Sequence, residues 1–273
     1  MVTSTQTLWL PVARDLRRND AHDRDWEALD RRLERLNARY ARAPWRCFGN
    51  EARSALLFRA GVHLPVDQAF VGPTDYPQPS LDRFLIRPSI EPIIYSNWHR
   101  FDSWNIDDPW ALDLTAALIG RKAGHRLHSA GKPPFGDLPA MAYAPLDQAG
   151  GWLEAVNAAR HRSDLTPLRA AALIHAIVIL YHPMDDGNGR LARAMFHGAL
   201  RSLAGIDAPF LSLGPVSYIL SYYLLGLTRR LSQSGDWAAY LDGAYHVMAI
   251  AIANQELFED DDALESLMAD PSS

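Results

Sequence analysis

The apolar residues of this 273-residue chain follow a helical period over most of its length. In the charged segment 14–46 they recur at alternating spacings of three and four, which places them on one face of a helix. Because this stripe lasts barely two heptads, we interpret it as a helix packed on the rest of the protein and not as a coiled coil. The stripe consists of Trp26, Leu29, Leu33, Leu36 and Tyr40.

Prolines interrupt the pattern between residues 61 and 109. Such proline density prevents long helices and predicts ordered connecting structure. Aromatic residues are interleaved with the prolines, and we expect them to pack in the core, although they could instead form a surface for a partner. These aromatics are Phe70, Tyr76, Phe84, Tyr95, Trp98, Phe101, Trp104 and Trp110.

Helical patterns dominate from residue 110 onward. A Gly- and Pro-rich interruption at 129–145 contains one short extended piece, 138–143. The chain is therefore predicted to be all-α, with an N-terminal extension (1–109) packed on or regulating a core (110–258), and an acidic tail (259–273). Helices are expected at 110–127, 152–161, from Pro167 (with Thr166 as N-cap) to just before Pro183, and at 189–204, 215–232 and 236–258.

Composition and charge exclude several classes of protein. Hydrophobic residues make up 48% of the chain and charged residues 22%, which excludes disorder throughout. A net charge of −5 is too balanced for non-specific nucleic-acid binding, so no nucleic acid is expected as a partner. The charge-free run 208–228 has the length of a membrane span, but its prolines and glycines favour a loop followed by a buried helix. Without a recognisable secretory signal, we expect a cytoplasmic protein, or an effector delivered into another cell.

One polar segment between two apolar helices, residues 182–190, is not explained by packing. Gly187 and Gly189 permit positive φ and close approach to the backbone, so successive N–H groups could form an anion-binding nest at the start of the following helix. Arg190 and Arg193 lie three residues apart and share one helix face. The segment is therefore suited to binding phosphates.

Two further side chains of this segment could supply chemistry. Asp186 offers the hard oxygen ligand that Mg²⁺ prefers beside phosphate oxygens. His182 is suited to accept a proton near neutral pH. A calcium loop is disfavoured because the alternating ligands and the final Glu of an EF-hand are absent. The alternative without catalysis is that His182 and Asp186 only cap the adjoining helices. We interpret His175 and His197 as core or surface histidines without a catalytic role.

The segment His182-Pro183-Met184-Asp185-Asp186-Gly187-Asn188-Gly189-Arg190, with Arg193, resembles the active-site loop of Fic-domain proteins. The pattern of that family is His-x-Phe-x-(Asp/Glu)-Gly-Asn-Gly-Arg-x-x-Arg, and the chain departs from it only in having Met184 for Phe. Met is a flexible apolar substitute at a position that anchors the loop. The segment 140–145 is similar to the family's flap hairpin, which lines up the target beside the catalytic histidine.

The resemblance implies a Fic-type helical bundle and transfer of AMP from ATP to a Ser, Thr or Tyr hydroxyl of a target protein. His182 would be the general base, and Asp186 would hold Mg²⁺. The phosphates would be cradled by Gly187, Asn188 and Gly189 and neutralised by Arg190 and Arg193. Met141, Ala142 and Tyr143 would form the flap that docks the target.

Several alternatives remain open at this point. The same fold could transfer UMP or phosphocholine, use a small-molecule acceptor, or serve as a non-catalytic binding module. A Doc-type kinase is disfavoured because that branch has Lys in place of Gly189. Many relatives are inhibited by a helix with the pattern (Ser/Thr)-x-x-x-Glu-(Gly/Asn), and the nearest segment here, around Glu91, has Arg87 and Pro92 at the flanking positions. We therefore expect Arg193 to be free. The enzyme would then be unrestrained, restrained by a separate inhibitory protein, or regulated by a feature that the sequence does not reveal.

Overall fold

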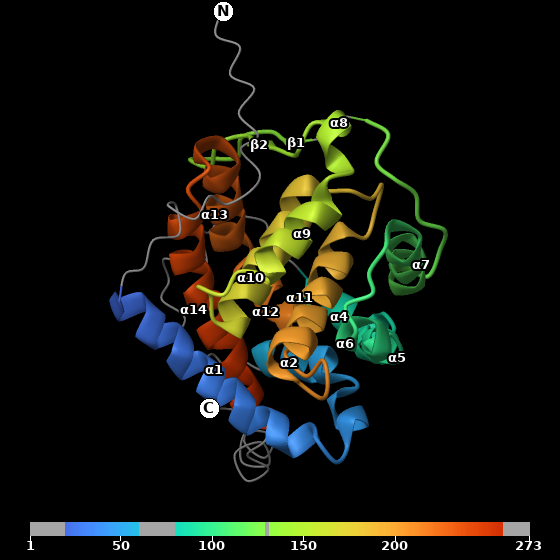
Figure 1. Ribbon diagram of the computed structural model, residues 1–273, viewed down its shortest axis with the longest axis vertical. Helices are drawn as coiled ribbons and strands as arrows, with labels where there is room; N and C mark the ends of the chain where they lie inside the picture. The colour runs from blue at the N-terminus through green and yellow to red at the C-terminus, as the bar shows by residue number, and fades with distance from the viewer. Residues whose placement is uncertain (1–19, 60–79, 129–130, 259–273) are drawn as a thin grey trace, which may run out of the picture.

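The computed structural model describes residues 20–59, 80–128 and 131–258, which form a bundle of helices with one small hairpin (Figure 1). The predicted all-α fold is confirmed. In chain order the elements are α1 (Asp20–Tyr40), the 3₁₀ turn η2 (Pro44–Cys47), α2 (Asn50–Arg59), α4 (Asp82–Ile86), α5 (Glu91–Ser96), α6 (Trp98–Asp102), α7 (Asp108–Ile119), β1 (Gly131–Lys132), β2 (Met141–Ala142), α8 (Leu146–Ala149), α9 (Trp152–Arg160), α10 (Pro167–Tyr181), α11 (Asn188–Ala204), α12 (Leu213–Ile219), α13 (Ser221–Ser234) and α14 (Trp237–Phe258).

The bundle is built around α10 and α11, which pack against each other along their lengths. The sequence of α10 is apolar on nearly every face, and the helix is accordingly surrounded by α1, α9, α11, α13 and α14. α11 is covered on its other side by α5, α6 and α7. Because α10 ends where the polar segment begins and α11 starts where it ends, the two most buried helices fix both ends of this segment.

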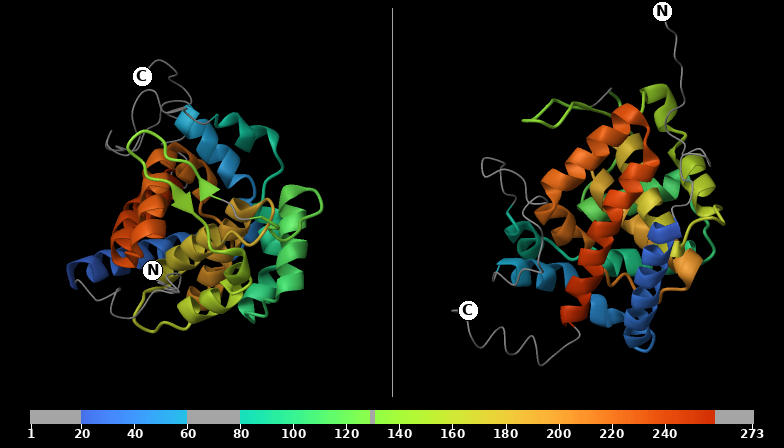
Figure 2. Two further views of the ribbon diagram at one scale, coloured as in Figure 1. Left: turned by 90° about the horizontal axis from the view of Figure 1, so that it is seen from above. Right: turned by 90° about the vertical axis from the view of Figure 1, so that its left-hand side faces the viewer.

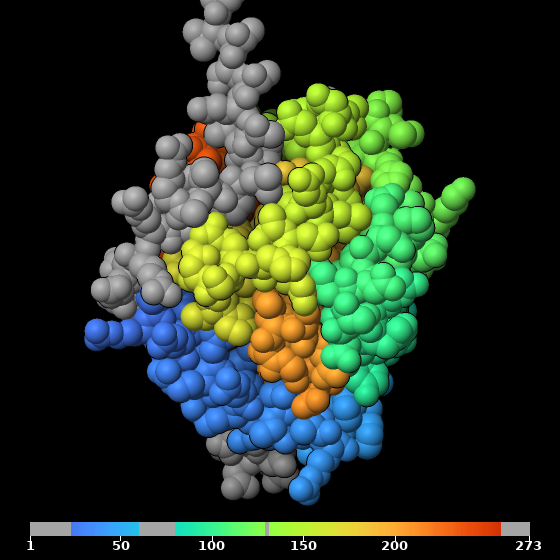
Figure 3. All heavy atoms as spheres, viewed as in Figure 1, coloured from blue at the N-terminus to red at the C-terminus, as the bar shows by residue number. Residues whose placement is uncertain are grey.

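The N-terminal helix α1 belongs to the same core. All five residues of the predicted apolar stripe are buried, with exposed fractions between 0 and 3%. The stripe packs α1 against α14 and α10. Arg32 adds a bidentate ion pair to Glu256 of α14, with N–O distances of 3.0 and 2.5 Å. The described N-terminal residues, blue to green in Figure 3, thus cover the lower side and one flank of the bundle.

Two helices differ from the sequence-based expectation. The helix predicted for 110–127 spans Asp108–Ile119 and ends at Gly120, whose φ of 72° is left-handed. Residues 121–128 then run as a largely extended segment. The helix predicted for 215–232 is two helices, α12 and α13, with Leu220 at the break between them.

The proline-interrupted region is more helical than expected, since it contains the short helices α4, α5 and α6. The prediction that its aromatics pack in the core is confirmed for Trp98, Phe101 and Trp110, which are buried. The ring of Phe101 packs edge to face against each of the two tryptophans. The ring of Phe101 lies where a side chain at Gly198 of α11 would lie, so that glycine permits the close contact. Phe70, Tyr76 and the predicted tail 259–273 lie outside the described residues.

The hairpin of β1 and β2 lies at one end of the bundle (Figure 2). Its antiparallel register pairs Gly131 with Ala142 and Lys132 with Met141. The segment before β2 is attached to α13, because Arg229 donates to the carbonyl of Pro139 at 2.5 Å and Gln233 donates to that of Ala140 at 3.0 Å. Among the described helices, none is both long and apolar enough to cross a membrane.

Candidate active site

The polar segment starts with an abrupt change of backbone direction. His182 ends α10 with φ 48° and ψ 55°, a left-handed conformation that is unusual for a residue with a side chain. Gly187 begins α11 with φ 83°, and a Cβ there would lie 2.7 Å from Ile119 and 2.8 Å from Thr115 of α7. Only glycine satisfies both restrictions at position 187.

The second glycine acts differently from the prediction. Gly189 lies inside α11 with ordinary helical geometry, so the expected positive φ is wrong for this residue. A Cβ at Gly189 would meet no atom within 4 Å, and the residue lines the cavity described below. Its lack of a side chain therefore leaves open space above the start of the helix.

Two side chains of the loop form hydrogen bonds with main-chain groups in and beside it. The amide of Asn188 accepts from the N–H of Met184 at 2.9 Å and donates to the carbonyl of Met184 at 2.8 Å. Met184 itself is fully buried, so it fills the anchoring position predicted for it. Asp185 accepts from the N–H groups of Gly124 and Asp186, at 3.1 and 2.8 Å. The side chains of Asn188 and Asp185 thus shape the loop.

Arg126 is the anchoring residue that sequence reasoning missed. It lies in the non-helical segment after α7, and its buried guanidinium donates to four main-chain carbonyls: His182 at 2.9 Å, Tyr181 at 3.3 Å, Ala144 at 2.5 Å and His128 at 3.5 Å. The Arg126 N–H also donates to the carbonyl of Pro183 at 3.0 Å. This one residue connects the end of α10, the loop and the residue after the flap. No local pattern around position 126 indicates this role.

His182 is held face to face with an aromatic ring of the flap. The rings of His182 and Tyr143 stack with centroids 3.9 Å apart and planes 12° from parallel. Burial lowers the pKa of His182 from its usual 6.5 to about 4, while the carbonyl of Ile179 opposes this shift. The imidazole is therefore neutral at pH 7, as a proton acceptor must be.

Asp186 carries its charge on the exposed side of the loop. Its carboxylate accepts from the Gly187 N–H at 2.7 Å and forms an ion pair with Arg121 at 2.6 Å. The Gly187 hydrogen bond and, next, the Arg121 guanidinium hold the pKa of Asp186 below its usual range. Asp186 is consequently ionised and solvent-accessible at neutral pH.

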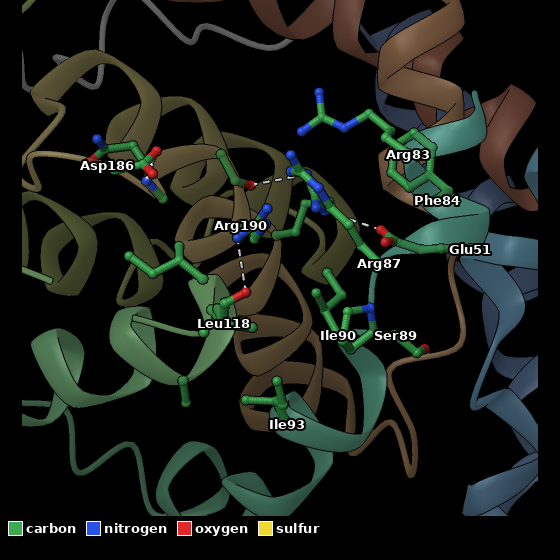
Figure 4. A pocket seen from close by; sticks show the side chains of 18 of the residues that line it. Glu51, Arg83, Phe84, Arg87, Ser89, Ile90, Ile93, Leu118, Asp186 and Arg190 are labelled. Carbon is green, nitrogen blue, oxygen red and sulfur yellow. Dashed lines mark hydrogen bonds and ion pairs between the residues drawn. The ribbon is translucent and has the colours of Figure 1, made fainter. Parts of the chain in front are cut away.

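The two arginines of the motif have different surroundings. Arg190 donates to the carbonyl of Leu118 at 3.0 Å (Figure 4). Arg193 donates to the carbonyl of Gly189 at 3.3 Å and forms an ion pair with Glu51 of α2 at 3.1 Å. The expectation of a free Arg193 is therefore wrong.

Glu51 is placed by contacts from three directions. Its own N–H donates to Glu91 at 2.9 Å, and its carboxylate accepts from the Gly214 N–H at 3.1 Å as well as facing Arg193. The pattern of inhibitory helices passes over Glu51 because Cys47 and Ala52 stand at the two flanking positions of the motif. A looser pattern that accepts any small residue at both positions would have found it.

Glu51 and most residues of the loop line one cavity of about 790 Å³. Its floor and one wall come from the loop and α11, including His182, Asp186, Gly187, Arg190 and Arg193. The opposite wall comes from α2 and the segment 83–93 (Figure 4). The structure thus brings the predicted loop residues together, while Met141, Ala142 and Tyr143 lie on the hairpin, joined to the site through the Tyr143–His182 stack.

The profile of the Fic/DOC family matches residues 112–200, from α7 through most of α11. The chain carries a Fic domain. Two solved Fic proteins have a similar fold. One is a Fic family protein from Desulfovibrio desulfuricans G20, with 14% identity, a TM-score of 0.53, and coverage of 86% of this chain and 75% of the other.

The other is a Fic domain containing signaling protein from Bacteroides thetaiotaomicron VPI-5482, with 12% identity and a TM-score of 0.52. The match covers 90% of this chain and 98% of that protein. At such identities the likeness concerns the fold. A comparison with curated protein sequences gives no match. The Fic domain supports a transferase of the Fic type.

Proposed function

We propose that this protein transfers AMP from ATP to a hydroxyl of a target protein. The observation that supports this proposal best is the shared cavity of His182, the start of α11 at Gly187, and the guanidinium of Arg190. A proton acceptor, a helix N-terminus and a fixed cation are what transfer from a phosphate chain needs.

The proposed reaction assigns one step to each group. The acceptor hydroxyl gives its proton to His182 while its oxygen forms a bond to the α-phosphorus of ATP. The bond from that phosphorus to the bridging oxygen breaks, and pyrophosphate leaves. The N–H groups at the start of α11 and the guanidiniums of Arg190 and Arg193 stabilise the negative charge on the phosphates.

Mg²⁺ would be held by Asp186 in this proposal. Its carboxylate is ionised and exposed, which suits an ion bound mainly by phosphate oxygens and water. The choice of Asp186 over Asp185 rests on the family pattern, because one oxygen of Asp185 accepts two N–H groups while both oxygens of Asp186 are engaged, by Gly187 and by Arg121. Among the described residues, no cluster of three or more acidic, His or Cys side chains could hold a metal without such outside ligands. The ion would neutralise phosphate charge when bound.

The flap would present the target to His182. Met141 is buried and fixes β2, while the neighbouring Ala142 is exposed and leaves the strand accessible. An extended target segment could pair with such a short strand. The stack of Tyr143 on His182 would then place the target hydroxyl near the proton acceptor.

UMP transfer remains the main alternative donor chemistry, because nothing in the cavity distinguishes the base. Phosphocholine transfer is less favoured, since a choline cation would enter a cavity lined by several arginines. A small-molecule acceptor in place of a protein also stays possible. Restraint by a separate inhibitory protein stays a prediction, and within this chain Glu51 already forms an ion pair with Arg193.

The test is label transfer from nucleotides in a lysate. The full chain is incubated with Mg²⁺ and each of ATP, GTP, CTP and UTP labelled at the α-phosphate. We expect label from ATP to appear on a protein, and the His182→Ala variant to give none. Label from UTP alone would show the alternative donor, and absence of label from all four would contradict nucleotidyl transfer.

A further inference from the structure

Two arginines outside the matched Fic domain line the same cavity. Arg83 belongs to α4, and Arg87 follows its end, whereas the family profile begins at residue 112. Both face the cavity on the wall opposite Asp186 (Figure 4). They are therefore contributed by the N-terminal part of the chain to a space built mainly by the Fic domain.

Arg83 is held in place by aromatic rings. Its guanidinium donates to the hydroxyl of Tyr218 at 2.9 Å and lies 4.7 Å from the centroid of that ring. The centroid of the Phe84 ring lies 5.7 Å from the same guanidinium, and this ring packs edge to face against Tyr218. A guanidinium fixed in this way keeps its remaining N–H donors oriented, which lowers the entropy cost of binding an anion.

Arg87 has a different environment. Within the part of the chain that the structure describes, its side chain makes no hydrogen bond or ion pair. It nevertheless lies near Arg190. The pKa of Arg190 is lowered first by burial, and among the neighbouring cations Arg87 contributes more to this shift than Arg193 or Arg83. Arg87 is thus an unpaired cation directed at three other cations.

The cluster carries an excess of positive charge. Arg83, Arg87, Arg190 and Arg193 face one carboxylate, Glu51, among the residues that line the cavity on this side. The two acidic residues of the loop are engaged elsewhere, with Arg121 and with main-chain N–H groups. Like charges gathered without counter-ions repel one another, and a bound polyanion would relieve this repulsion.

We propose that Arg83 and Arg87, with Arg190, form a subsite for the terminal phosphate of a nucleoside triphosphate donor. This inference rests on the proposed function and adds how the donor is selected. With the α-phosphate at Gly187 and the two arginines on the opposite wall, the terminal phosphate of a triphosphate would extend further toward Arg83 and Arg87 than that of a diphosphate. The N-terminal part of the chain would then select the donor by its number of phosphates.

Binding measurements test this subsite without requiring an acceptor. The affinities of ATP, ADP and inorganic tripolyphosphate are measured by calorimetry for the full chain, for Arg87→Gln and for Arg83→Gln. Arg42→Gln is the matched control, because Arg42 is an exposed arginine outside the cavity. The side chain of Arg87 is exposed, so this variant is expected to fold normally.

We expect the unchanged protein to bind ATP at least about tenfold more tightly than ADP, as a charge-assisted contact provides. Arg87→Gln should lose about tenfold in affinity for ATP and tripolyphosphate, and less than about twofold for ADP. Arg42→Gln should change none of these values. Arg83→Gln should reproduce the pattern of Arg87→Gln.

Three results would overturn the inference: equal binding of ATP and ADP by the unchanged protein, equal weakening of both by Arg87→Gln, or no weakening of either. Reduced labelling of a target with unchanged ATP binding would show that the arginines contact an acidic target instead. If ATP is preferred as expected but no label is ever transferred, the proposed function fails and the subsite stands.

Discussion

The loop 182–193 and the N-terminal region 20–102 build the same cavity by different means. In the loop, neighbours in sequence are neighbours in space, as when Asn188 binds both main-chain groups of Met184. In the N-terminal region, the functional groups reach the cavity through long-range packing, as Glu51 does when it pairs with Arg193. The first kind of site can be recognised from a motif, whereas the second depends on how α2 and α4 are placed.

This difference separates chemistry from its control. The loop supplies the proton acceptor and the helix N-terminus, which the proposed transfer requires of any substrate. The N-terminal region supplies Glu51, Arg83 and Arg87, which under the proposed function would set how many cations a donor meets. Loss of the proton acceptor in the loop should therefore abolish activity, and changes in the N-terminal region should tune it.

The largest effect is expected from His182→Ala. Removal of a general base typically lowers a rate by about 10²–10⁴-fold. Because the phosphate-binding groups remain, nucleotide affinity should stay within about threefold. Label transfer and calorimetry measure the two quantities, with His99→Ala, at an exposed histidine on α6, as the control. Near-normal transfer by His182→Ala would remove this residue from the mechanism.

Arg126→Ala should destabilise the protein as well as abolish its activity. The substitution leaves four main-chain carbonyls without this donor, which should lower the free energy of unfolding by roughly 3 kcal/mol. Urea denaturation measures this change. Arg121→Ala is the control, because its ion pair with Asp186 is exposed and should contribute less than about 1 kcal/mol. Equal effects of the two changes would show that Arg126 does not anchor the loop.

The two acidic residues of the loop should respond differently to substitution. Asp186→Asn should lose activity that excess Mg²⁺ partly restores, since the charge that would hold the ion is removed. Asp185→Asn should be mild because the amide oxygen can still accept the two N–H groups, whereas Asp185→Ala should not be. Rates of label transfer at several Mg²⁺ concentrations decide this. Equal damage from both Asn variants would indicate that the two carboxylates share the ion.

The pH profile should reflect the buried position of His182. For a histidine with the ordinary pKa of 6.5, the neutral fraction that can act as a base would be about 25-fold smaller at pH 5 than at pH 7. With its pKa lowered to about 4, His182 stays mostly neutral at pH 5. The kcat/KM for ATP should therefore change less than twofold between these pH values, in contrast to a decline centred near pH 6.5.

Most of the fold follows from local rules. The stripe from Trp26 to Tyr40 predicted α1, and the apolar run before Pro183 predicted α10. The end of α7 at Gly120 was missed because the predicted helix was extended to Leu127, whereas a glycine followed by polar residues is a usual helix end. For Gly189 the predicted positive φ is wrong because the residue lies inside α11, while the space beside its backbone agrees with the predicted close approach.

The candidate site was predictable in its loop and not in its surroundings. Position and spacing identified His182, Asp186 and Arg190, but the sequence contains no signal that brings Arg126 to the carbonyl of His182. The same holds for Glu51, whose partner lies on a helix far along the chain. Contacts of this kind are set by tertiary packing, which neither hydrophobic period nor motif describes.

If the N-terminal region restrains the Fic-domain site, the ion pair of Glu51 with Arg193 is the contact through which it would act. The most direct measurement is the dissociation constant of ATP for Glu51→Gln, compared with Glu256→Gln, which removes an equivalent charge from the ion pair with Arg32 outside the cavity. Freeing Arg193 and removing a negative charge should tighten ATP binding about tenfold in Glu51→Gln and leave Glu256→Gln unchanged. Unchanged or weaker ATP binding by Glu51→Gln would contradict the account.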